Sequence, residues 1–284
     1  MPPFRRHLAL ALAGLTLAAC GVQSTEPSSS GNSDVHQGFD TSIYPGDAAM
    51  RAWLPPASPY EWTGYYLPAP CHRDASWSGT RGALQGMGWG IAAIYVGQQE
   101  WEGLPDLIPW PSGVLRTAVA DRFPLLAATQ PTCSRTLLSA AQGQTEGNDA
   151  AARMAADGFA PGSVVYLDVE YITTVDQTMK DYVTGWIAAV LLDGRYAPGV
   201  YVAKRNADEI RAVALGAYSG AGRTGEPRWW IASSSSFSRA SAPTAVGLAY
   251  ANAWQGLFDQ SETHGGATVT IDVDVADAAS PSAP

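Results

Sequence analysis

Residues Val164–Glu170, with the sequence Val-Val-Tyr-Leu-Asp-Val-Glu, decide the fold class of this chain. The run is continuous in apolar residues, which is typical of a strand buried on both faces in a parallel sheet. Its two acids, Asp168 and Glu170, are two positions apart and therefore point to the same face of the strand. A buried strand that ends in paired carboxylates predicts an α/β protein with its chemistry at the carboxyl end of the sheet.

Seven further stretches have strand patterns, and helical patterns separate several of them. The expected strands are 38–42, 61–67, 89–97, 199–203, 228–233, 249–255 and 268–275, and the expected helices are 47–54, 149–156, 177–192 and 206–215, with shorter helical stretches at 114–122 and 135–141. Strands that alternate with helices form parallel βαβ units, and eight strands favour closure into a single (β/α)8 TIM-type barrel. The helix expected after the sixth strand is hard to identify in 236–247.

The 284-residue chain is globular in composition and acidic. Hydrophobic residues make up 46% and charged residues 15%, and 17 Lys and Arg against 26 Asp and Glu give a formal net charge of −9. Nucleic acids and anionic membrane surfaces are bound through clustered cations, so this balance argues against both as partners. An acidic chain with 10 Trp and 12 Tyr favours a neutral polymer such as a glycan, and we expect a monomer.

The first 35 residues have the pattern of an export signal followed by a tether. Two arginines precede an apolar run over 8–19, which is too short to span a hydrocarbon core of ~30 Å. Leu-Ala-Ala-Cys at 17–20 resembles a bacterial lipobox, so we expect residues 1–19 to be removed and Cys20 to be lipidated. An ordinary signal peptide with a chance cysteine is the alternative, and both the general and the twin-arginine export routes stay open. Residues 20–35 are the expected tether, which predicts a location in the bacterial cell envelope, lipid-anchored to the membrane and facing the cell wall.

Cys71 and Cys133 are the two cysteines left after the predicted lipidation site. In an oxidising, exported compartment a remaining pair favours one disulfide, and two buried free thiols are the alternative. Residues 278–284 are predicted to be a disordered tail, which leaves 36–277 for the barrel.

One sequence motif suggests a nucleotide cofactor, and its context argues against it. Gly-Ala-Gly-Arg-Thr-Gly at 220–225 matches the letters of the dinucleotide-binding fingerprint, but it follows a helical pattern and precedes a strand, the reverse of the required order. The 4 histidines never pair at metal-ligand spacing. We therefore expect neither a cofactor nor a metal.

Three further acids fall in the first and eighth expected strands. Asp40 ends the first strand, and Asp272 and Asp274 share one face of the eighth. In a closed barrel these two strands are neighbours and the fourth lies across the mouth, so the acids meet where barrel enzymes carry their active groups. Crowded, buried carboxylates raise one another's pKa, which would leave one protonated beside an ionised neighbour. The alternative is that these are surface acids or helix caps at misassigned strand ends.

Five short motifs occur in an order that matches a known family. They are Gly-Phe-Asp-Thr-Ser at 38–42, Ile-Tyr-Val-Gly-Gln at 94–98, Val-Tyr-Leu-Asp-Val-Glu at 165–170, Trp-Gln at 254–255 and Ile-Asp-Val-Asp at 271–274. Together they resemble the glycoside-hydrolase-like domain of the DUF1906 group, which is similar to the family 25 lysozymes, bacterial and phage muramidases on a modified barrel. The resemblance covers about residues 36–277. Gly256 stands where the lysozymes usually have Tyr, and Val273-Asp274 where they usually have Leu-Asn.

The resemblance implies a catalytic set at the mouth of the barrel. Glu170 would be the general acid, and Asp168, Asp40 and Asp272 would stabilise positive charge on the sugar or orient its acetamido group or a water. The candidate substrate-binding residues are Tyr66, Tyr95, Gln98, Trp229, Trp230, Trp254, Gln255 and Asp274. For the aromatic side chains among them, simple core filling is the alternative to sugar stacking.

These observations predict an exported, membrane-anchored glycoside hydrolase-like protein that acts on cell-wall glycan, with peptidoglycan as the substrate. A non-catalytic glycan-binding barrel and a hydrolase of another exported polysaccharide are the two alternatives. The sequence does not decide between an inverting route and a retaining route, because the choice depends on the separation of the carboxyl groups.

Overall fold

The structure of this chain is a computed structural model that describes residues 35–100, 133–170 and 172–284. The predicted signal peptide, the lipidation site Cys20, the tether as far as residue 34 and the helical stretch expected at 114–122 lie outside the described residues. Within the described ranges, no helix is both long enough and apolar enough to cross a membrane.

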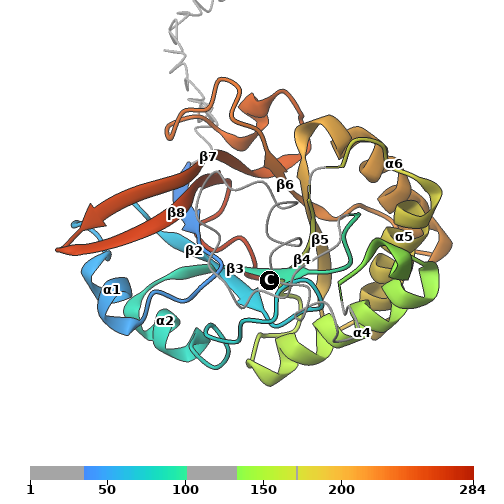
Figure 1. The fold of residues 1–284 in the computed structure, drawn as a ribbon, viewed down its shortest axis with the longest axis horizontal. Coiled ribbons are helices and arrows are strands. Elements are labelled where there is room, and N and C mark those ends of the chain that lie inside the picture. The colour runs from blue at the N-terminus through green and yellow to red at the C-terminus, as the bar shows by residue number, and fades with distance from the viewer. Residues whose placement is uncertain (1–34, 101–132, 171) are drawn as a thin grey trace, which may run out of the picture. The chain divides into compact units, whose positions relative to one another are not determined.

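The described residues form a closed eight-stranded barrel in which β1 to β8 are neighbours in chain order (Figure 1). The strands are β1 His36–Asp40, β2 Trp62–Leu67, β3 Gly90–Val96, β4 Val164–Val169, β5 Ala197–Ala203, β6 Arg228–Ala232, β7 Ala251–His264 and β8 Ala267–Ala276. The helices are α1 Asp47–Ala52, α2 Arg81–Met87, α4 Ala140–Ala156, α5 Gln177–Asp193 and α6 Lys204–Gly220, with 3₁₀ helices η2 Arg135–Leu137 and η3 Pro243–Val246. The predicted α/β class and barrel closure are confirmed.

The eighth strand breaks the parallel order that the sequence predicts. Strands β1 to β7 pair in parallel, but β8 is antiparallel to both β7 and β1. Gly265 and Gly266 form a tight turn that joins β7 directly to β8, and a Gly-Gly pair between two extended runs is a hairpin signal. The expectation of eight uniform strand–helix units is therefore wrong at its last unit. The hairpin extends beyond the barrel on the side of α1, where the Trp53 indole donates to Ala267 O at 2.9 Å (Figure 1).

Helix α4 is one continuous helix where the sequence predicts two short ones. It begins after Ser139, whose hydroxyl accepts a hydrogen bond from Gln142 N, and it runs through the expected break at 142–148. Gly143 is needed in its middle because α4 packs closely against α5, and a Cβ there would lie 2.1 Å from Tyr182 O. The glycine therefore permits close packing of the two helices.

Alternation along the strands separates two apolar clusters. Trp62 of β2 and Trp230 of β6 are in contact, with ring centroids 5.4 Å apart, although their strands are not neighbours. This contact is possible only across the interior of the closed barrel, so these side chains fill it together with Tyr166. The larger cluster, which includes Phe39 and Leu167, lies between the strands and the helices. The barrel is therefore solid below its mouth.

The C-terminal residues 278–284, predicted to be disordered, pack instead against the amino ends of β3 and β4. Ser282 is 2% exposed, its N–H donates to Ile91 O at 2.9 Å, and its hydroxyl accepts from Ala93 N at 2.7 Å. Val164 N donates to Ser282 O at 3.0 Å. The tail is ordered because it supplies partners for backbone groups that the sheet leaves open at this end.

Candidate active site

The carboxyl ends of the strands surround a small cavity of about 60 Å³, named here the acid cavity. Its lining residues come from the barrel strands and the residue after β4, and they are Asp40, Tyr66, Ile94, Asp168, Glu170, Tyr201, Trp230, Gln255 and Asp272. The four residues predicted as catalytic, at the ends of β1 and β4 and in β8, therefore lie together. Of the predicted substrate-binding residues, Tyr66, Trp230 and Gln255 also line this cavity.

Asp40 is held on the inner face of β1 by two donors. The Tyr66 hydroxyl donates to its Oδ1 at 2.6 Å, and Gln255 Nε2 donates to its Oδ2 at 2.6 Å. Burial raises the pKa of Asp40 above its usual value of 3.8, although both donors work in the opposite direction. Gly64 on the neighbouring strand leaves room for this carboxyl, because a Cβ at Gly64 would lie 2.6 Å from Asp40 Cβ.

Asp272 faces Asp40 across the antiparallel β1–β8 pair. Its Oδ1 accepts a hydrogen bond from Asp259 N at 2.7 Å, and its Oδ2 accepts a longer one from Gln255 Nε2 at 3.3 Å. Burial and the nearby Asp40 carboxylate raise the pKa of Asp272 to about 8. Asp272 therefore retains a proton at neutral pH.

Asp274 lies one inward position deeper in the barrel than Asp272 and is fully buried. Its Oδ1 accepts from the Trp230 indole N–H at 3.0 Å. Burial and the charge of Asp40 raise the pKa of Asp274 well above its usual range, which favours its neutral form. Asp274 supports the acid cavity from below and is not one of its lining residues, contrary to its predicted contact with substrate.

Gln255 connects the acids of β1 and β8 to β5. Its amide nitrogen donates to Asp40 and Asp272, and its Oε1 accepts from the Tyr201 hydroxyl at 2.6 Å. Tyr201 was missed in the sequence, although its alternation with Val200 and Val202 in β5 places it on the inner face, beside Asp168 in the register. The amide orientation of Gln255 is fixed because each of its two ends has a partner.

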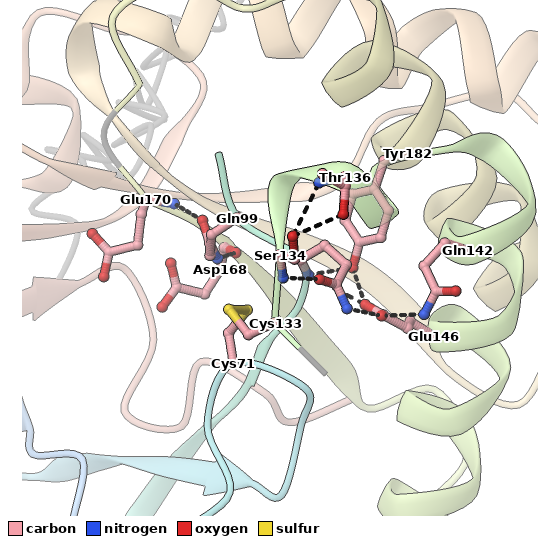
Figure 2. Close-up of a disulfide and its surroundings, with 11 residues drawn as sticks. Cys71, Gln99, Cys133, Ser134, Thr136, Gln142, Glu146, Asp168, Glu170 and Tyr182 are labelled. Carbon is pink, nitrogen blue, oxygen red and sulfur yellow. Dashed lines mark hydrogen bonds between the residues drawn. A yellow bond between two sulfur atoms is a disulfide. The ribbon is translucent and has the colours of Figure 1, made fainter. Parts of the chain in front are cut away.

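Gln99, another residue that the sequence did not single out, braces the end of β4. Its Nε2 donates to Asp168 O at 2.8 Å, and its Oε1 accepts from Glu170 N at 3.1 Å. Figure 2 shows this bridge and shows the Asp168 and Glu170 side chains projecting to the same side. Gln99 is completely buried, so its side chain fixes the backbone that carries both acids.

Gln98, which the sequence predicts as a substrate-binding residue, points away from the acid cavity. Its Nε2 donates to Glu146 Oε1 of α4 at 2.7 Å, and its Oε1 accepts from Ser134 N at 2.9 Å. The Tyr182 hydroxyl of α5 also donates to Glu146 (Figure 2). This network ties the end of β3 to the helices, so Gln98 does not line the acid cavity, and Gln99 is the glutamine that reaches the end of β4.

Cys71 and Cys133 form a disulfide between segments 62 residues apart in the chain. Both cysteines are buried in the interior cluster, and Figure 2 shows the bond between them. Cys71 N donates to Val96 O at 3.1 Å, and Ser134 follows Cys133 into the Gln98 network. The disulfide thus fastens the β2–β3 connection to the chain that enters η2.

Three aromatic residues predicted to stack on sugar lie in the outer core instead. Tyr95 donates to Asp149 Oδ2 of α4 at 3.0 Å, and the indole N–H groups of Trp229 and Trp254 donate to Glu226 and to Ser233 O. Each of the three is completely buried among the helix-facing residues. They occupy the strand positions that alternate with the inward ones, which makes the core-filling alternative the right one for them.

The described residues contain no group of three or more His, Cys, Asp or Glu side chains that could hold a metal ion. The chemistry that the acid cavity offers is proton transfer and electrostatic stabilisation of positive charge. The raised pKa of Asp272 leaves it protonated at neutral pH, and burial also raises the pKa of Asp274. Tyr66 and Gln255 direct donors at the carboxyl group of Asp40.

A closed α/β barrel with acids gathered at the carboxyl ends of its strands is consistent with a glycoside hydrolase-like protein. The chain belongs to the Rv2525c-like, glycoside hydrolase-like domain family, whose model matches residues 51–276. This match confirms the family resemblance that the five sequence motifs carry.

Solved structures that are similar to the chain have low sequence identity to it. An uncharacterized protein of B. stearothermophilus has a TM-score of 0.56 at 14% identity, covering 85% of this chain and 95% of its own. The modular autolysin LytC of Streptococcus pneumoniae, solved with a synthetic peptidoglycan ligand, has a TM-score of 0.51 at 11% identity, covering 85% of this chain but only 46% of LytC. The Tat-secreted protein Rv2525c of Mycobacterium tuberculosis has a TM-score of 0.44 at 16% identity, covering 84% of this chain and 93% of its own. No curated protein matches the sequence.

Proposed function

We propose that the protein is an exported glycoside hydrolase that cleaves cell-wall glycan, with peptidoglycan as its substrate. The observation that carries the proposal is the convergence of Asp40, Asp168, Glu170 and Asp272 on one cavity, with Gln255 bonded to two of them. The family and the fold shared with an autolysin solved with a peptidoglycan ligand support the same substrate class.

In the proposed reaction Glu170 protonates the departing glycosidic oxygen. Its carboxyl projects from the end of β4 into the acid cavity, and Gln99 holds the backbone at this position. Asp168, on the same side of the strand, orients the acetamido group of the sugar or stabilises the positive charge that develops on the ring. Asp40 supports the same charge, and its two donors hold its carboxyl in place.

The size of the acid cavity limits what it holds. Its volume of about 60 Å³ is well below the ~300–1,000 Å³ of typical small-molecule sites. The cavity therefore suits an acetamido group or an attacking water, and the sugar ring itself lies above it. Identifying the anomer that is released, by proton NMR, distinguishes an inverting route from a retaining one in which the acetamide is the nucleophile.

Anchoring at the membrane is the second part of the proposal. It rests on the apolar run at 8–19 and on Cys20 at the end of a lipobox-like sequence. A lipid on Cys20 and the tether that follows would hold the barrel beside the cell wall, where its substrate is.

The test is muropeptide analysis of purified cell walls after incubation with the purified protein. The proposal predicts new reducing ends, and borohydride reduction followed by mass spectrometry identifies them as N-acetylmuramic acid. Binding to the walls without any product would favour the non-catalytic glycan-binding barrel. Cleavage of a different exported polysaccharide, with the cell walls left intact, would favour the alternative that the protein is a hydrolase of that polysaccharide.

A further inference from the structure

A second cavity, named here the hairpin cavity, opens beside the acid cavity and has a volume of about 350 Å³. The two cavities share Asp40, Tyr66 and Asp272. The other residues that line the hairpin cavity are Thr41, Ser42, Ile43, Asp259, Thr270 and Ile271. Sites for small molecules commonly measure ~300–1,000 Å³, so the hairpin cavity reaches the size of a ligand site and the acid cavity does not.

The lining of the hairpin cavity combines hydroxyl-bearing and apolar residues with Asp40, Asp259 and Asp272. Thr41, Ser42 and Thr270 contribute hydroxyls, and Ile43 contributes an apolar side chain that is 43% exposed. A pyranose ring has the complementary surface, with hydroxyl groups around a C–H face. Among the described residues that line the cavity there is no Lys, Arg or His, so its chemistry suits a neutral sugar better than a phosphate or another anion.

The backbone of β7 is shaped at the wall of this cavity. The pairing of β7 with β8 shifts register between Gln255 and Leu257 and again between Leu257 and Gln260, which is a bulged region. Within it Asp259 has a φ of 54°, in the left-handed region that few non-glycine residues adopt. This conformation directs Asp259 N toward Asp272 Oδ1 at 2.7 Å. Bulges and unusual backbone conformations of this kind are concentrated at functional sites.

We propose that the hairpin cavity is a saccharide subsite, which holds the sugar unit next to the one whose glycosidic bond lies over Glu170. This inference rests on the proposed glycan-cleaving or glycan-binding function and adds the path of the chain: the glycan runs from the acid cavity, past Asp272, along β1 and the base of the β7–β8 hairpin. Asp272 lines both the acid cavity and the hairpin cavity. The bulge at Asp259 therefore links the wall of the hairpin cavity to Asp272, which also lines the acid cavity.

The experiment fills the hairpin cavity without changing the acids. Thr270→Tyr places a ring in the cavity from β8, and Ser42→Tyr does so from the loop after β1, as an independent variant in case one fails to fold. Thr268→Tyr is the matched control, because Thr268 is exposed on the same face of the same strand but is not among the lining residues. Thermal unfolding shows that each variant is folded before it is assayed.

The measurement is the dependence of kcat/KM on glycan length, with a peptidoglycan disaccharide, tetrasaccharide and hexasaccharide as substrates. The kcat/KM of the wild type is expected to rise with glycan length. On the hexasaccharide the two cavity-filling variants are expected to have a kcat/KM about tenfold lower, as the loss of one well-packed contact would produce, and the control is expected to match the wild type. Cleavage by all four proteins with the same length profile would overturn the subsite and leave the proposed function intact. If the wild type cleaves none of these substrates, the affinity for the hexasaccharide is measured by calorimetry instead, and the two cavity-filling variants are expected to bind more weakly than the wild type and the control. Equal affinity in all four proteins would overturn the subsite. No binding by the wild type would overturn the proposed function itself.

Discussion

The substitution Asp272→Asn should make the protein more stable at alkaline pH and flatten the dependence of its stability on pH. The new side chain would keep an acceptor oxygen for Asp259 N and would present an amide group where the protonated acid has its hydroxyl. It therefore imitates the neutral form of Asp272 at every pH, beside Asp40 and Gln255.

The size and sign of the effect follow from the raised pKa of Asp272. Burial and the charge of Asp40 raise it from its usual value of 3.8 to about 8 in the folded protein. The stabilisation from the bound proton is complete below about pH 4, declines as the pH rises, and is lost as the pH passes through about 8. Between about pH 5 and pH 8 each unit is worth ~1.4 kcal/mol, so the wild type should lose about 4 kcal/mol that the variant does not lose.

The assay is urea denaturation of both proteins at intervals between about pH 5 and pH 8.5, followed by tryptophan fluorescence. The difference between their free energies of unfolding is the quantity to plot, because Asp40 and Asp274 also have raised pKa values and contribute to the slope of both proteins. If the free energies of unfolding of the wild type and the variant change in parallel across this range, Asp272 does not hold its proton in the folded state. That result would refute the raised pKa assigned to Asp272.

Three further predictions concern residues around the acid cavity and the anchor. Gln99→Ala should lower kcat by more than about tenfold, up to about 10², with little change in KM, because it releases the backbone that positions Glu170. Steady-state kinetics on glycan that show an unchanged kcat and a raised KM would contradict this. Replacing Cys71 and Cys133 together by Ser should lower the free energy of unfolding by about 4 kcal/mol, as expected for a loop closed across 62 residues, and denaturation that matches the wild type would argue against it. Cys20→Ala should move the protein out of the membrane fraction or block its processing; a wild-type protein that is soluble with Cys20 unmodified would refute lipid anchoring.

Strand alternation and barrel closure were enough to predict that the acids of β1, β4 and β8 meet at the carboxyl ends of the strands. A period of two placed Asp168 with Glu170 and Asp272 with Asp274, and closure of the barrel brought β8 beside β1, which carries Asp40. These inferences depend only on local backbone geometry and on strand order. The antiparallel direction of β8 did not disturb them, because reversing a strand leaves its alternating faces unchanged.

The residues that the sequence misplaced depend on long-range contacts. Gln98 and Gln99 follow β3 outside its regular alternation, and only the positions of Glu146 and of the β4 backbone decide which glutamine turns inward. Trp229 and Trp230 are adjacent in the chain, and one fills the outer core while the other lines the acid cavity. Composition alone cannot separate such neighbours, but a strict count of inward positions along β6 could have done so.

The structure also explains why a glycine, Gly256, follows the Trp-Gln motif. A Cβ at Gly256 would lie 1.8 Å from the ring of Phe237, which comes from the connection between β6 and β7 and packs on Trp254. Phe237 thus fills the space beside this strand from another part of the chain. A Tyr at this position, as in the lysozyme pattern, would clash with Phe237 unless that ring moved.

The most direct measurement is the release of reducing ends from purified cell walls by the wild type and by Glu170→Gln, with wall binding of both proteins measured in parallel. The amide keeps the shape of the side chain and the hydrogen bond from the backbone N–H of this residue to Gln99, but it has no carboxyl proton to donate. We predict equal binding and a loss of release of about 10²–10⁴, the contribution of general acid catalysis. Release within about tenfold of the wild type would show that another residue is the acid, and binding by both proteins without release by either would show that the barrel binds glycan without cleaving it.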